Sequence, residues 1–478
     1  MSIIIPANSA SGGFEVDNSC RFNDGSSDYL NRTQTMGNRT TFTFSAWVKR
    51  SSFGEQNLIT VGTSGTSRTQ FHFQGQDALQ FYNNDGGSVN MYIKTNRLFR
   101  DLSAWYHIVL RFDTTQSTAS DRIRFYVNGE EETSLATNTI PSEDADNTQF
   151  NYNGIVADIG RRHYDATGYF DGYMAEVCFI DGQSLAPTSF GEFDEDSGIW
   201  KPKAVSGLTF GTNGFYLDFE DSSALGNDAA GSNNWTTNNL TAVDQSTDTC
   251  TNNFSTWNPI LAMNSTMVIA DGNLTGTTAS NYANGASNCW FSTMGVSSGK
   301  WYVEIKQSAG TNNQGQQLGI GYDLPKFQQG SGVNAYNVGY ISEGWGYLGS
   351  EGRVVNNNNG VLTGLSTWTI GDTIGIALDL DNYKLYFRKN GGSWENSGNP
   401  ESGSTGTGAI SLTTGKTYFF GVSDASLSNT YTFQANFGSA PYAISSGNQD
   451  GNDRGNFEYA VPSGYLAICT KNLSEALS

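Results

Sequence analysis

Charged residues, proline, histidine and cysteine are all scarce in this chain of 478 residues. Asp, Glu, Lys and Arg together make up only 15% of the sequence, and there are 9 prolines and 3 histidines. The 5 cysteines are scattered, odd in number and form no CxxC pair, which argues against a disulfide framework or a zinc site. We interpret them as buried thiols of a protein made in a reducing compartment: Cys20, Cys178, Cys250, Cys289 and Cys469.

Long apolar runs and an excess of basic residues are also missing. The opening stretch MSIIIPANSA has no basic residue before its isoleucines, and Pro6 ends the apolar run. We therefore expect neither a signal peptide nor membrane insertion. The chain has 26 Lys and Arg against 46 Asp and Glu, so its formal net charge is −20. Such a polyanion repels nucleic-acid phosphates, and we expect no nucleic-acid binding.

Glycine, aromatic residues and short alternating segments are plentiful. In DRIRFYVNGEE (121–131), Ile123, Phe125 and Val127 alternate with polar residues, and Asn128-Gly129 supplies a tight hairpin turn. A similar phrase returns as NYKLYFRKNGGSW (382–394). Because sustained helical periodicity is absent, we predict an all-β protein with more than one domain.

Strand candidates and turn residues divide the chain into four predicted segments. We expect a β-sandwich over residues 1–206, a polar connector with one strand (GFYLDFED) over 207–259, a second sandwich over 260–445 and a C-terminal segment over 446–478. The connector is expected to lie along a neighbouring domain, anchored by Trp235, Phe254 and Trp257.

Two ordered sets of motifs carry a family resemblance. The stretches FSAWVKR, WYHIVLRFD, RIRFYVNGEE and FDGYMAEVCFID resemble the laminin-G-like, concanavalin A-like jelly-roll family. The later stretches GKWYVEI, LGIGYD, GDTIGIALDLDNYKLYFRKNG, TYFFGVS and ANFG are similar to a SPRY (B30.2) domain, which is also a concanavalin A-like sandwich. The resemblance therefore implies two jelly-roll sandwiches of one architectural kind, joined by an extended connector.

A further resemblance concerns the origin of the chain. The phrases DFEDSSALGND, TNNFSTWNPI and FEYAVPSGYLAICTKNLSEALS resemble long tail proteins of marine bacteriophages, as does the combination of both domain types. This implies a non-enzymatic virion protein: a tail fibre, tail spike or receptor-binding appendage that adheres to host surface glycan. It would be made in the host cytoplasm and released by lysis, would contact other virion proteins, and is expected to form a homotrimer. A decoration or tail accessory protein with only protein–protein contacts is one alternative.

A surface-polysaccharide glycosidase is the other alternative. Glu192, Asp194 and Asp196 in GEFDEDSG have the i, i+2, i+4 spacing that would place carboxylates on one strand face. Gly198 follows where the strand should continue, which favours an acidic surface loop. We therefore assign no catalytic residue.

Metal sites have equally weak signals. His and Cys clusters are absent, and the oxygen-rich loops NNDGG (83–87), SEDADN (142–147) and DGNDRGN (450–456) lack EF-hand spacing. We assign no cofactor and keep calcium at such a loop as an alternative.

Loops that combine aromatic, amide and charged side chains are the best ligand-binding candidates, because a sugar needs a flat apolar face and directed hydrogen bonds. The alternative is that these aromatics cover strand faces or fill subunit contacts. The candidate residues are Arg161, Arg162, His163, Tyr164 and Asp165 in the first block, and Tyr336, Trp345, Tyr347 and Arg353 in the second.

Overall fold

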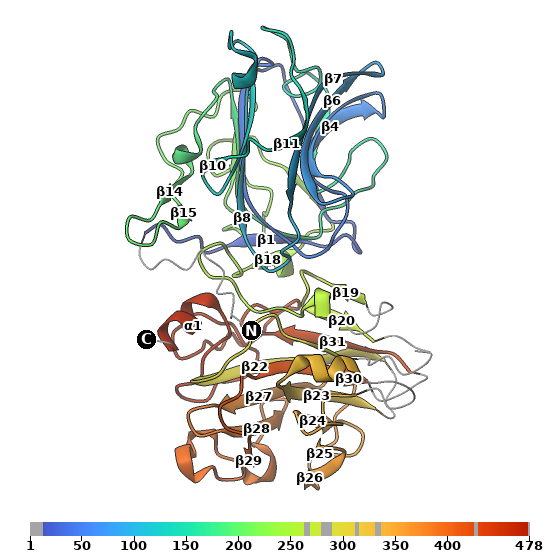
Figure 1. Cartoon of the computed structure of the whole chain (residues 1–478), viewed down its shortest axis with the longest axis vertical. Coiled ribbons are helices and arrows are strands. Elements are labelled where there is room, and N and C mark those ends of the chain that lie inside the picture. Colours follow the sequence, from blue (N-terminus) through green and yellow to red (C-terminus); the bar gives the residue numbers. More distant parts are fainter. Residues whose placement is uncertain are drawn as a thin grey trace. The chain divides into compact units, whose positions relative to one another are not determined.

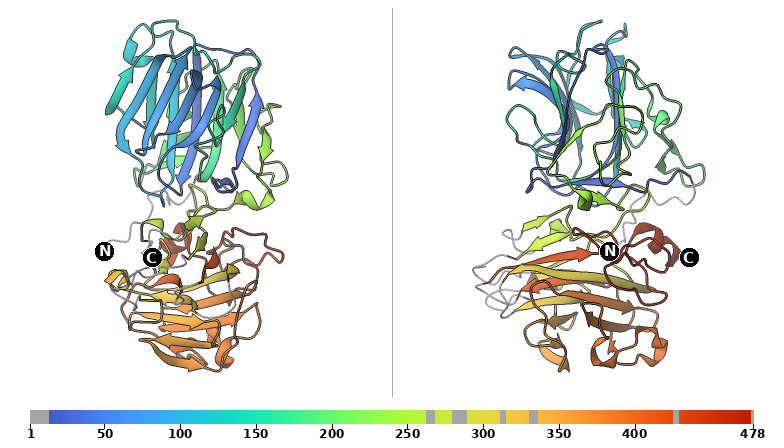
Figure 2. Two further views of the ribbon diagram at one scale, coloured as in Figure 1. Left: turned by 90° about the vertical axis from the view of Figure 1, so that its right-hand side faces the viewer. Right: turned by 180° about the vertical axis from the view of Figure 1, so that it is seen from behind.

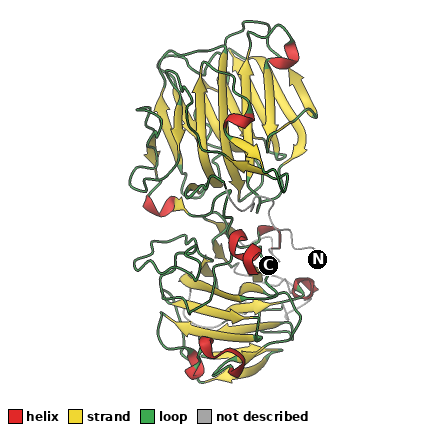
Figure 3. Ribbon diagram, turned by 90° about the vertical axis from the view of Figure 1, so that its left-hand side faces the viewer, coloured by secondary structure: helices red, strands yellow, loops and turns green. Residues whose placement is uncertain are grey.

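The computed structural model describes residues 13–261, 268–278, 289–310, 315–329, 336–424 and 429–476. The chain divides into two compact units, Pro6–Asn253 and Phe254–Ser478, which we call the first and the second sandwich. Figure 1 draws the first from blue to green and the second from yellow-green to red. Strands dominate both units, as the yellow arrows of Figure 3 show. The helical elements are α1 (Thr470–Ala476) and short 3-10 turns at Ala119–Asp121, Pro187–Ser189, Ala242–Asp244, Pro259–Leu261, Leu324–Gln329, Glu395–Ser397 and Pro400–Thr405.

The first sandwich consists of two large antiparallel sheets, A and B, whose strands lie side by side in Figure 2. Sheet A has the order β10-β9-β8-β3-β13-β1-β18, with β16 also paired to β13, and sheet B has the order β11-β7-β6-β5-β4-β12-β2-β17. The strands of sheet A are β1 (Ser19–Phe22), β3 (Thr41–Arg50), β8 (Tyr106–Asp113), β9 (Ile123–Val127), β10 (Glu130–Glu131), β13 (Gly172–Asp181), β16 (Phe215–Leu217) and β18 (Gln245–Ser246). The strands of sheet B are β2 (Tyr29–Thr33), β4 (Gln56–Ser64), β5 (Ser67–Phe73), β6 (Ala78–Asp85), β7 (Ser88–Leu98), β11 (Leu135–Thr139), β12 (Val156–Ile159) and β17 (Thr236–Asn238). A separate hairpin pairs β14 (Gly191–Phe193) with β15 (Trp200–Pro202).

Period-2 alternation explains which face of each strand enters the core. In β3, Phe42, Phe44 and Val48 lie in the core between the sheets. The predicted hairpin of β9 and β10 is confirmed, because Val127 pairs with Glu130 across a two-residue turn. Asn128 and Gly129 adopt φ angles of 50° and 82°, the left-handed conformation that such a turn requires.

Residues 207–253 differ from the expected extended connector, because they belong to the first sandwich. They supply β16, β17 and β18, and Trp235 packs edge-on against Phe215 in the core with ring centroids 4.9 Å apart. We call this segment the strap. Its polar side chains satisfy its own turns: Asp228 accepts the backbone N–H groups of Tyr216, Ala230 and Asn233 at 2.9–3.0 Å.

The strap returns to the start of the first sandwich. β18 pairs with β1, so that Ser19 lies opposite Ser246. Just before β1, the backbone N–H of Val16 donates to Thr251 Oγ1 at 3.2 Å, and Thr251 Oγ1 donates back to the Val16 carbonyl at 3.0 Å. The first and last described segments of this unit therefore lie next to each other.

The second sandwich also has two antiparallel sheets, C and D. Sheet C has the order β19-β20-β31-β22-β27-β28-β29, and sheet D the order β21-β30-β23-β24-β25-β26. The strands of sheet C are β19 (Val268–Ala270), β20 (Thr275–Thr277), β22 (Lys300–Gly310), β27 (Thr373–Asp379), β28 (Lys384–Lys389), β29 (Ile410–Ser411) and β31 (Tyr431–Asn436). The strands of sheet D are β21 (Cys289–Phe291), β23 (Gln316–Gly321), β24 (Gly344–Leu348), β25 (Arg353–Asn356), β26 (Asn359–Thr363) and β30 (Phe419–Asp424).

The C-terminal segment, residues 446–476, is an integral layer of the second sandwich. Phe457 is fully buried against Tyr302 on the outer face of β22, with ring centroids 5.1 Å apart. Buried Glu304, on the same face, accepts the backbone N–H groups of Glu458 and Tyr459 at 2.9 and 2.8 Å. The apolar patch of this segment is therefore buried. Among the described residues, none of the helices has the length and apolar content needed to cross a membrane.

Candidate functional site

The outer face of sheet B carries a polar surface, because every second residue of its strands points away from the core. In β5, for example, Phe71 and Phe73 enter the core, while Arg68, Gln70 and His72 lie on the opposite face. The residues on this outer face are Tyr29 and Asn31 (β2), Asn57 and Thr60 (β4), Arg68, Gln70 and His72 (β5), Gln80 and Tyr82 (β6), Tyr92 and Lys94 (β7) and Asp158 (β12).

The segment 160–169, which we call the binding loop, folds onto this face and brings the five first-block candidates together. Thr60 Oγ1 donates to the Arg161 carbonyl at 2.8 Å and accepts the His163 backbone N–H at 3.2 Å. At the far end of the loop, Asn57 donates to the Gly168 carbonyl from its side-chain amide at 2.8 Å. Strand side chains therefore anchor the loop by hydrogen bonds.

Arg162 holds the tip of the binding loop by ion pairs. Its guanidinium donates to both carboxylate oxygens of Asp165 at 2.9 and 2.8 Å, and to Glu55 Oε1 at 2.5 Å. The hydrogen bond to Asp165 raises the pKa of Arg162, and Arg162 in turn lowers the pKa of Asp165. The loop tip is thus a charged but internally neutralised structure.

A second ion pair lies at the other end of the loop. Arg161 Nε donates to Asp158 Oδ2 at 2.5 Å, and His163 Nδ1 lies 3.0 Å from the same oxygen. Although burial opposes it, the bond to Asp158 raises the pKa of Arg161. Asp158 Oδ1 is buried and has no hydrogen-bond partner.

Aromatic rings and guanidinium groups alternate across the same face. Arg161 lies 3.4 Å from the centroid of the Tyr29 ring, and Tyr164 lies 5.1 Å from Arg68. Arg68 is also 5.0 Å from Tyr82, whose ring contacts Tyr92 edge-on at 5.6 Å. Flat rings beside directed N–H and carboxylate groups are the elements that bind a hydroxyl-rich ligand.

Sequence reasoning named the residues of the binding loop as candidates and did not name the strand residues beneath it, of which His72 is the most unusual. His72 is 5% exposed, and neither ring nitrogen has a hydrogen-bond partner. Its Nδ1 lies 3.7 Å from Glu55 Oε1. Burial lowers the pKa of His72. The alternation in SRTQFHF predicts that Arg68, Gln70 and His72 share one face of their strand. The stretch itself does not predict which face of the sheet the binding loop covers.

The four candidates of the second sandwich do not form a comparable site. Trp345 and Tyr347 of β24 are 5% and 0% exposed and lie in the core, where no ligand reaches their rings. The alternation Gly-Trp-Gly-Tyr explains this, because a Cβ on Gly344 would lie 1.8 Å from the Val338 carbonyl oxygen. The glycines let another segment cover the opposite face, so the aromatic rings must point inward.

The other two candidates lie near the surface of the second sandwich. Arg353 is half-buried and pairs with Glu351, with Nε and Oε2 2.6 Å apart. The Tyr336 ring lies 6.2 Å from that of Tyr340. These two residues therefore lie nearer the surface than Trp345 and Tyr347, whose rings are in the core.

The acidic stretch that resembled a glycosidase pair is a turn. β14 ends at Phe193, so Glu192, Asp194 and Asp196 do not continue along one strand face. Asp194 accepts the backbone N–H of Ser197 at 2.9 Å and pairs with Lys201 at 3.1 Å, and both contacts lower its pKa. These contacts favour the acidic surface loop over a catalytic pair.

A buried serine–histidine contact lies on the outer face of sheet A. Ser45 Oγ and His107 Nε2 are 2.9 Å apart, and Trp200 Nε1 donates to His107 Nδ1 at 3.0 Å. Because Nδ1 accepts the indole N–H, Nε2 carries the proton and donates it to Ser45. The imidazole in this state cannot accept the serine proton. Burial lowers the pKa of His107 to about 3.

The oxygen-rich loops use their oxygens to accept N–H groups. Asp450 accepts the backbone N–H groups of Asn452, Arg454 and Ala467 at 2.7–3.0 Å and the side-chain amide of Asn472 at 2.6 Å. Within the described ranges, no group of three or more His, Cys, Asp or Glu side chains is placed to hold a metal ion. Calcium binding stays a prediction.

Comparison with known families agrees with the two resemblances. The model of the concanavalin A-like lectin/glucanases superfamily matches residues 24–185, and the SPRY domain model matches residues 300–405. The chain therefore contains a concanavalin A-like domain and a SPRY domain in two regions, and the predicted all-β class with sandwich architecture is confirmed. Such domains suggest a carbohydrate- or protein-binding adhesion module. No curated protein matches the chain.

Three solved structures are similar to parts of this chain at low sequence identity. The SPRY domain of human HERC1 is 20% identical, with 37% of this chain and 96% of that chain covered and a TM-score of 0.28. A heptameric SAP-like pentraxin from Limulus polyphemus is 17% identical, with coverage of 36% and 78% and a TM-score of 0.27. Domain 4 of the arabinanase AbnA from Geobacillus stearothermophilus, solved with arabinotriose, is 14% identical, with coverage of 33% and 68% and a TM-score of 0.25. At these scores the similarity carries no argument about function.

Proposed function

We propose that this chain is a non-enzymatic adhesion protein of a bacteriophage virion, a tail fibre, tail spike or receptor-binding appendage, that binds a host cell-surface glycan through the outer face of sheet B. The observation that supports glycan binding is the binding loop, which places Tyr164 beside Arg68, whose guanidinium also lies over the Tyr82 ring on the same polar face. The virion assignment rests on the phrase resemblance of the strap and the C-terminal segment.

Adhesion by such a face needs several copies. Each face offers a few aromatic rings and hydrogen-bonding groups, so a single contact would be weak, and avidity in a homotrimer would supply the strength. The other partners would be virion proteins, and the chain would reach the outside when the host lyses. A stable trimer by light scattering after gel filtration, with calcium and with chelator, is the expected result, whereas a monomer in both conditions would favour a decoration or accessory subunit.

Glycan binding is tested by changing the exposed aromatic residues of the face. We expect Tyr82→Ala with Tyr92→Ala to weaken binding to arrayed host polysaccharide at least tenfold, because both rings lie half-exposed on the outer face. The matched control is Tyr152→Ala, whose ring is 41% exposed elsewhere in the same sandwich and should leave binding unchanged. Equal binding by all three proteins would reject the face.

The glycosidase alternative has its own test. The protein would be a glycosidase if it released reducing ends from host polysaccharide and the double variant Glu192→Gln with Asp194→Asn did not. This result would overturn the adhesion proposal. The contacts of Asp194 with Ser197 and Lys201 lead us to expect no release.

A further inference from the structure

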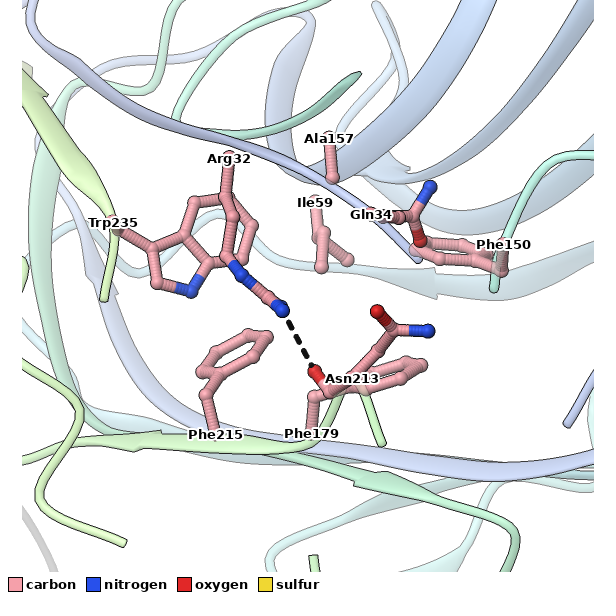
Figure 4. A pocket seen from close by; sticks show the side chains of 9 residues that line it. All are labelled: Arg32, Gln34, Ile59, Phe150, Ala157, Phe179, Asn213, Phe215 and Trp235. Carbon is pink, nitrogen blue, oxygen red and sulfur yellow. Dashed lines mark hydrogen bonds between the residues drawn. The ribbon is translucent and has the colours of Figure 1, made fainter. Parts of the chain in front are cut away.

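A small cavity lies between the inner face of sheet B and the strap of the first sandwich (Figure 4). Its volume is about 10 Å³, which suits one particle about the size of a water molecule or a chloride ion and is too small for a sugar. It is lined by Arg32, Gln34, Ile59, Phe150, Ala157, Phe179, Asn213, Phe215 and Trp235.

The indole N–H of Trp235 and the guanidinium of Arg32 both face this cavity. Trp235 is 5% exposed, and its indole Nε1 has no hydrogen-bond partner. In Figure 4 this nitrogen and the Arg32 guanidinium are turned toward the same space. An indole N–H can only donate, so a particle that satisfies it must accept.

Arg32 carries a positive charge that no carboxylate contacts. Its guanidinium donates to the Asn213 carbonyl at 3.2 Å and to the Asn233 side chain. Among the described residues, no carboxylate oxygen lies within the 4.0 Å that defines an ion pair with it. The Asp228 charge acts on it from farther away, but the oxygens of Asp228 already accept backbone N–H groups. Burial lowers the pKa of Arg32, as expected for a charge without a contacting partner.

The side-chain oxygens of Gln34 and Asn213 that line the cavity each already accept at least one hydrogen bond. Gln34 Oε1 accepts the Asn151 backbone N–H at 2.9 Å, and Asn213 Oδ1 accepts both the backbone N–H and the hydroxyl of Thr35 at 2.9 and 3.1 Å. A water molecule here would have to donate its protons to oxygens that already accept a hydrogen bond, such as Gln34 Oε1. An anion accepts from every side and also balances the guanidinium charge.

We propose that this cavity binds a single monatomic anion of chloride size, held by Arg32 and the indole N–H of Trp235. The anion would couple the strap to sheet B, because Trp235 belongs to the strap and Arg32 to β2. Carboxylates and phosphates exceed the available space. Because an anion that binds only the folded state stabilises it by mass action, the first sandwich would gain stability in chloride.

The test compares thermal unfolding of the full chain in sodium chloride, bromide and gluconate at one ionic strength. We expect the transition of the first sandwich to rise by about 2–4 °C in chloride and bromide relative to gluconate, while the second sandwich serves as internal reference. Arg32→Gln should abolish this rise. Trp235→Phe, which keeps most of the ring packing and removes only the N–H donor, should reduce it.

Trp47→Phe is the matched control, because Trp47 is a buried tryptophan of the same sandwich whose indole N–H also has no partner but does not line the cavity. It should retain the full chloride response. Equal unfolding temperatures in chloride and gluconate for the unaltered chain, or a full response in Arg32→Gln, would overturn the proposal and leave water as the occupant. If Arg32→Gln does not fold, the chloride NMR line width of the unaltered chain decides: broadening that bromide reverses supports the site, and its absence rejects it.

Discussion

The two sandwiches share an architecture and differ in what covers their sheets. In the first, the outer face of sheet B stays polar, and the binding loop lies on it through ion pairs of Arg161 and Arg162. In the second, the C-terminal segment buries the outer face of β22, and glycines let a segment close over β24. All three histidines of the chain also lie in the first sandwich. Which polar faces stay exposed in these two sandwiches therefore depends on the covering segments more than on the sheets.

The packing of the C-terminal segment on β22 of the second sandwich can be disrupted by one substitution at its centre. We expect Phe457→Ala to destabilise the second sandwich by about 3–5 kcal/mol, the usual cost of a cavity left by a buried phenylalanine, because Phe457 is fully buried. Urea unfolding followed by hydrogen exchange assigns the loss to one sandwich. The control Ile370→Ala, at a side chain 40% exposed, should cost little. A loss shared by both sandwiches would contradict the division into two units.

The acid response of the first sandwich offers a second test. Glu176 lies at a bulge of β13 with φ of 51°, and Tyr216 donates to its Oε2 at 2.7 Å. Burial raises the pKa of Glu176 to about 7. Because the folded-state pKa lies above the unfolded one, stability is fully present below pH ~4.5 and is lost as the pH rises through about 7.

The variant Glu176→Gln does not titrate, so it should gain about 2 kcal/mol relative to the unaltered chain between pH 5 and pH 8. Urea unfolding at both pH values measures the difference, in which the titration of groups such as His107 cancels. A difference that does not change with pH would show that the carboxyl group stays charged in the fold.

The smallest expected effect concerns the surface of the second sandwich. Arg353 and Glu351 form a partly exposed ion pair, so Arg353→Ala should change stability by less than about 0.5 kcal/mol and leave glycan binding unaltered. Loss of glycan binding in this variant would place the binding surface on the second sandwich and contradict the proposed difference between the two sandwiches.

The long strands and the turn at Asn128-Gly129 could be predicted because their pattern is local. Of the strap, the predicted strand GFYLDFED contains β16. β17 and β18 could not be predicted, since they contain two or three residues each and pair with strands up to about 230 residues away. Within the candidate site, the residues of the binding loop were recognisable as a cluster. Arg68 and Asp158 join it through strand register, and Glu55 precedes β4 and pairs with Arg162. The candidates Trp345 and Tyr347 of the second sandwich lie in its core, because glycine permits close backbone approach on the other face of their strand.

The pairing of β1 with β18 brings the first and last described segments of the first sandwich together. Since Val16 and Thr251 contact each other, the chain arrives and departs at one point of the unit. A module with adjoining ends can replace another of its kind without stretching the host chain. Exchange of the unit at these two positions would replace the outer face of sheet B while the second sandwich keeps its sequence.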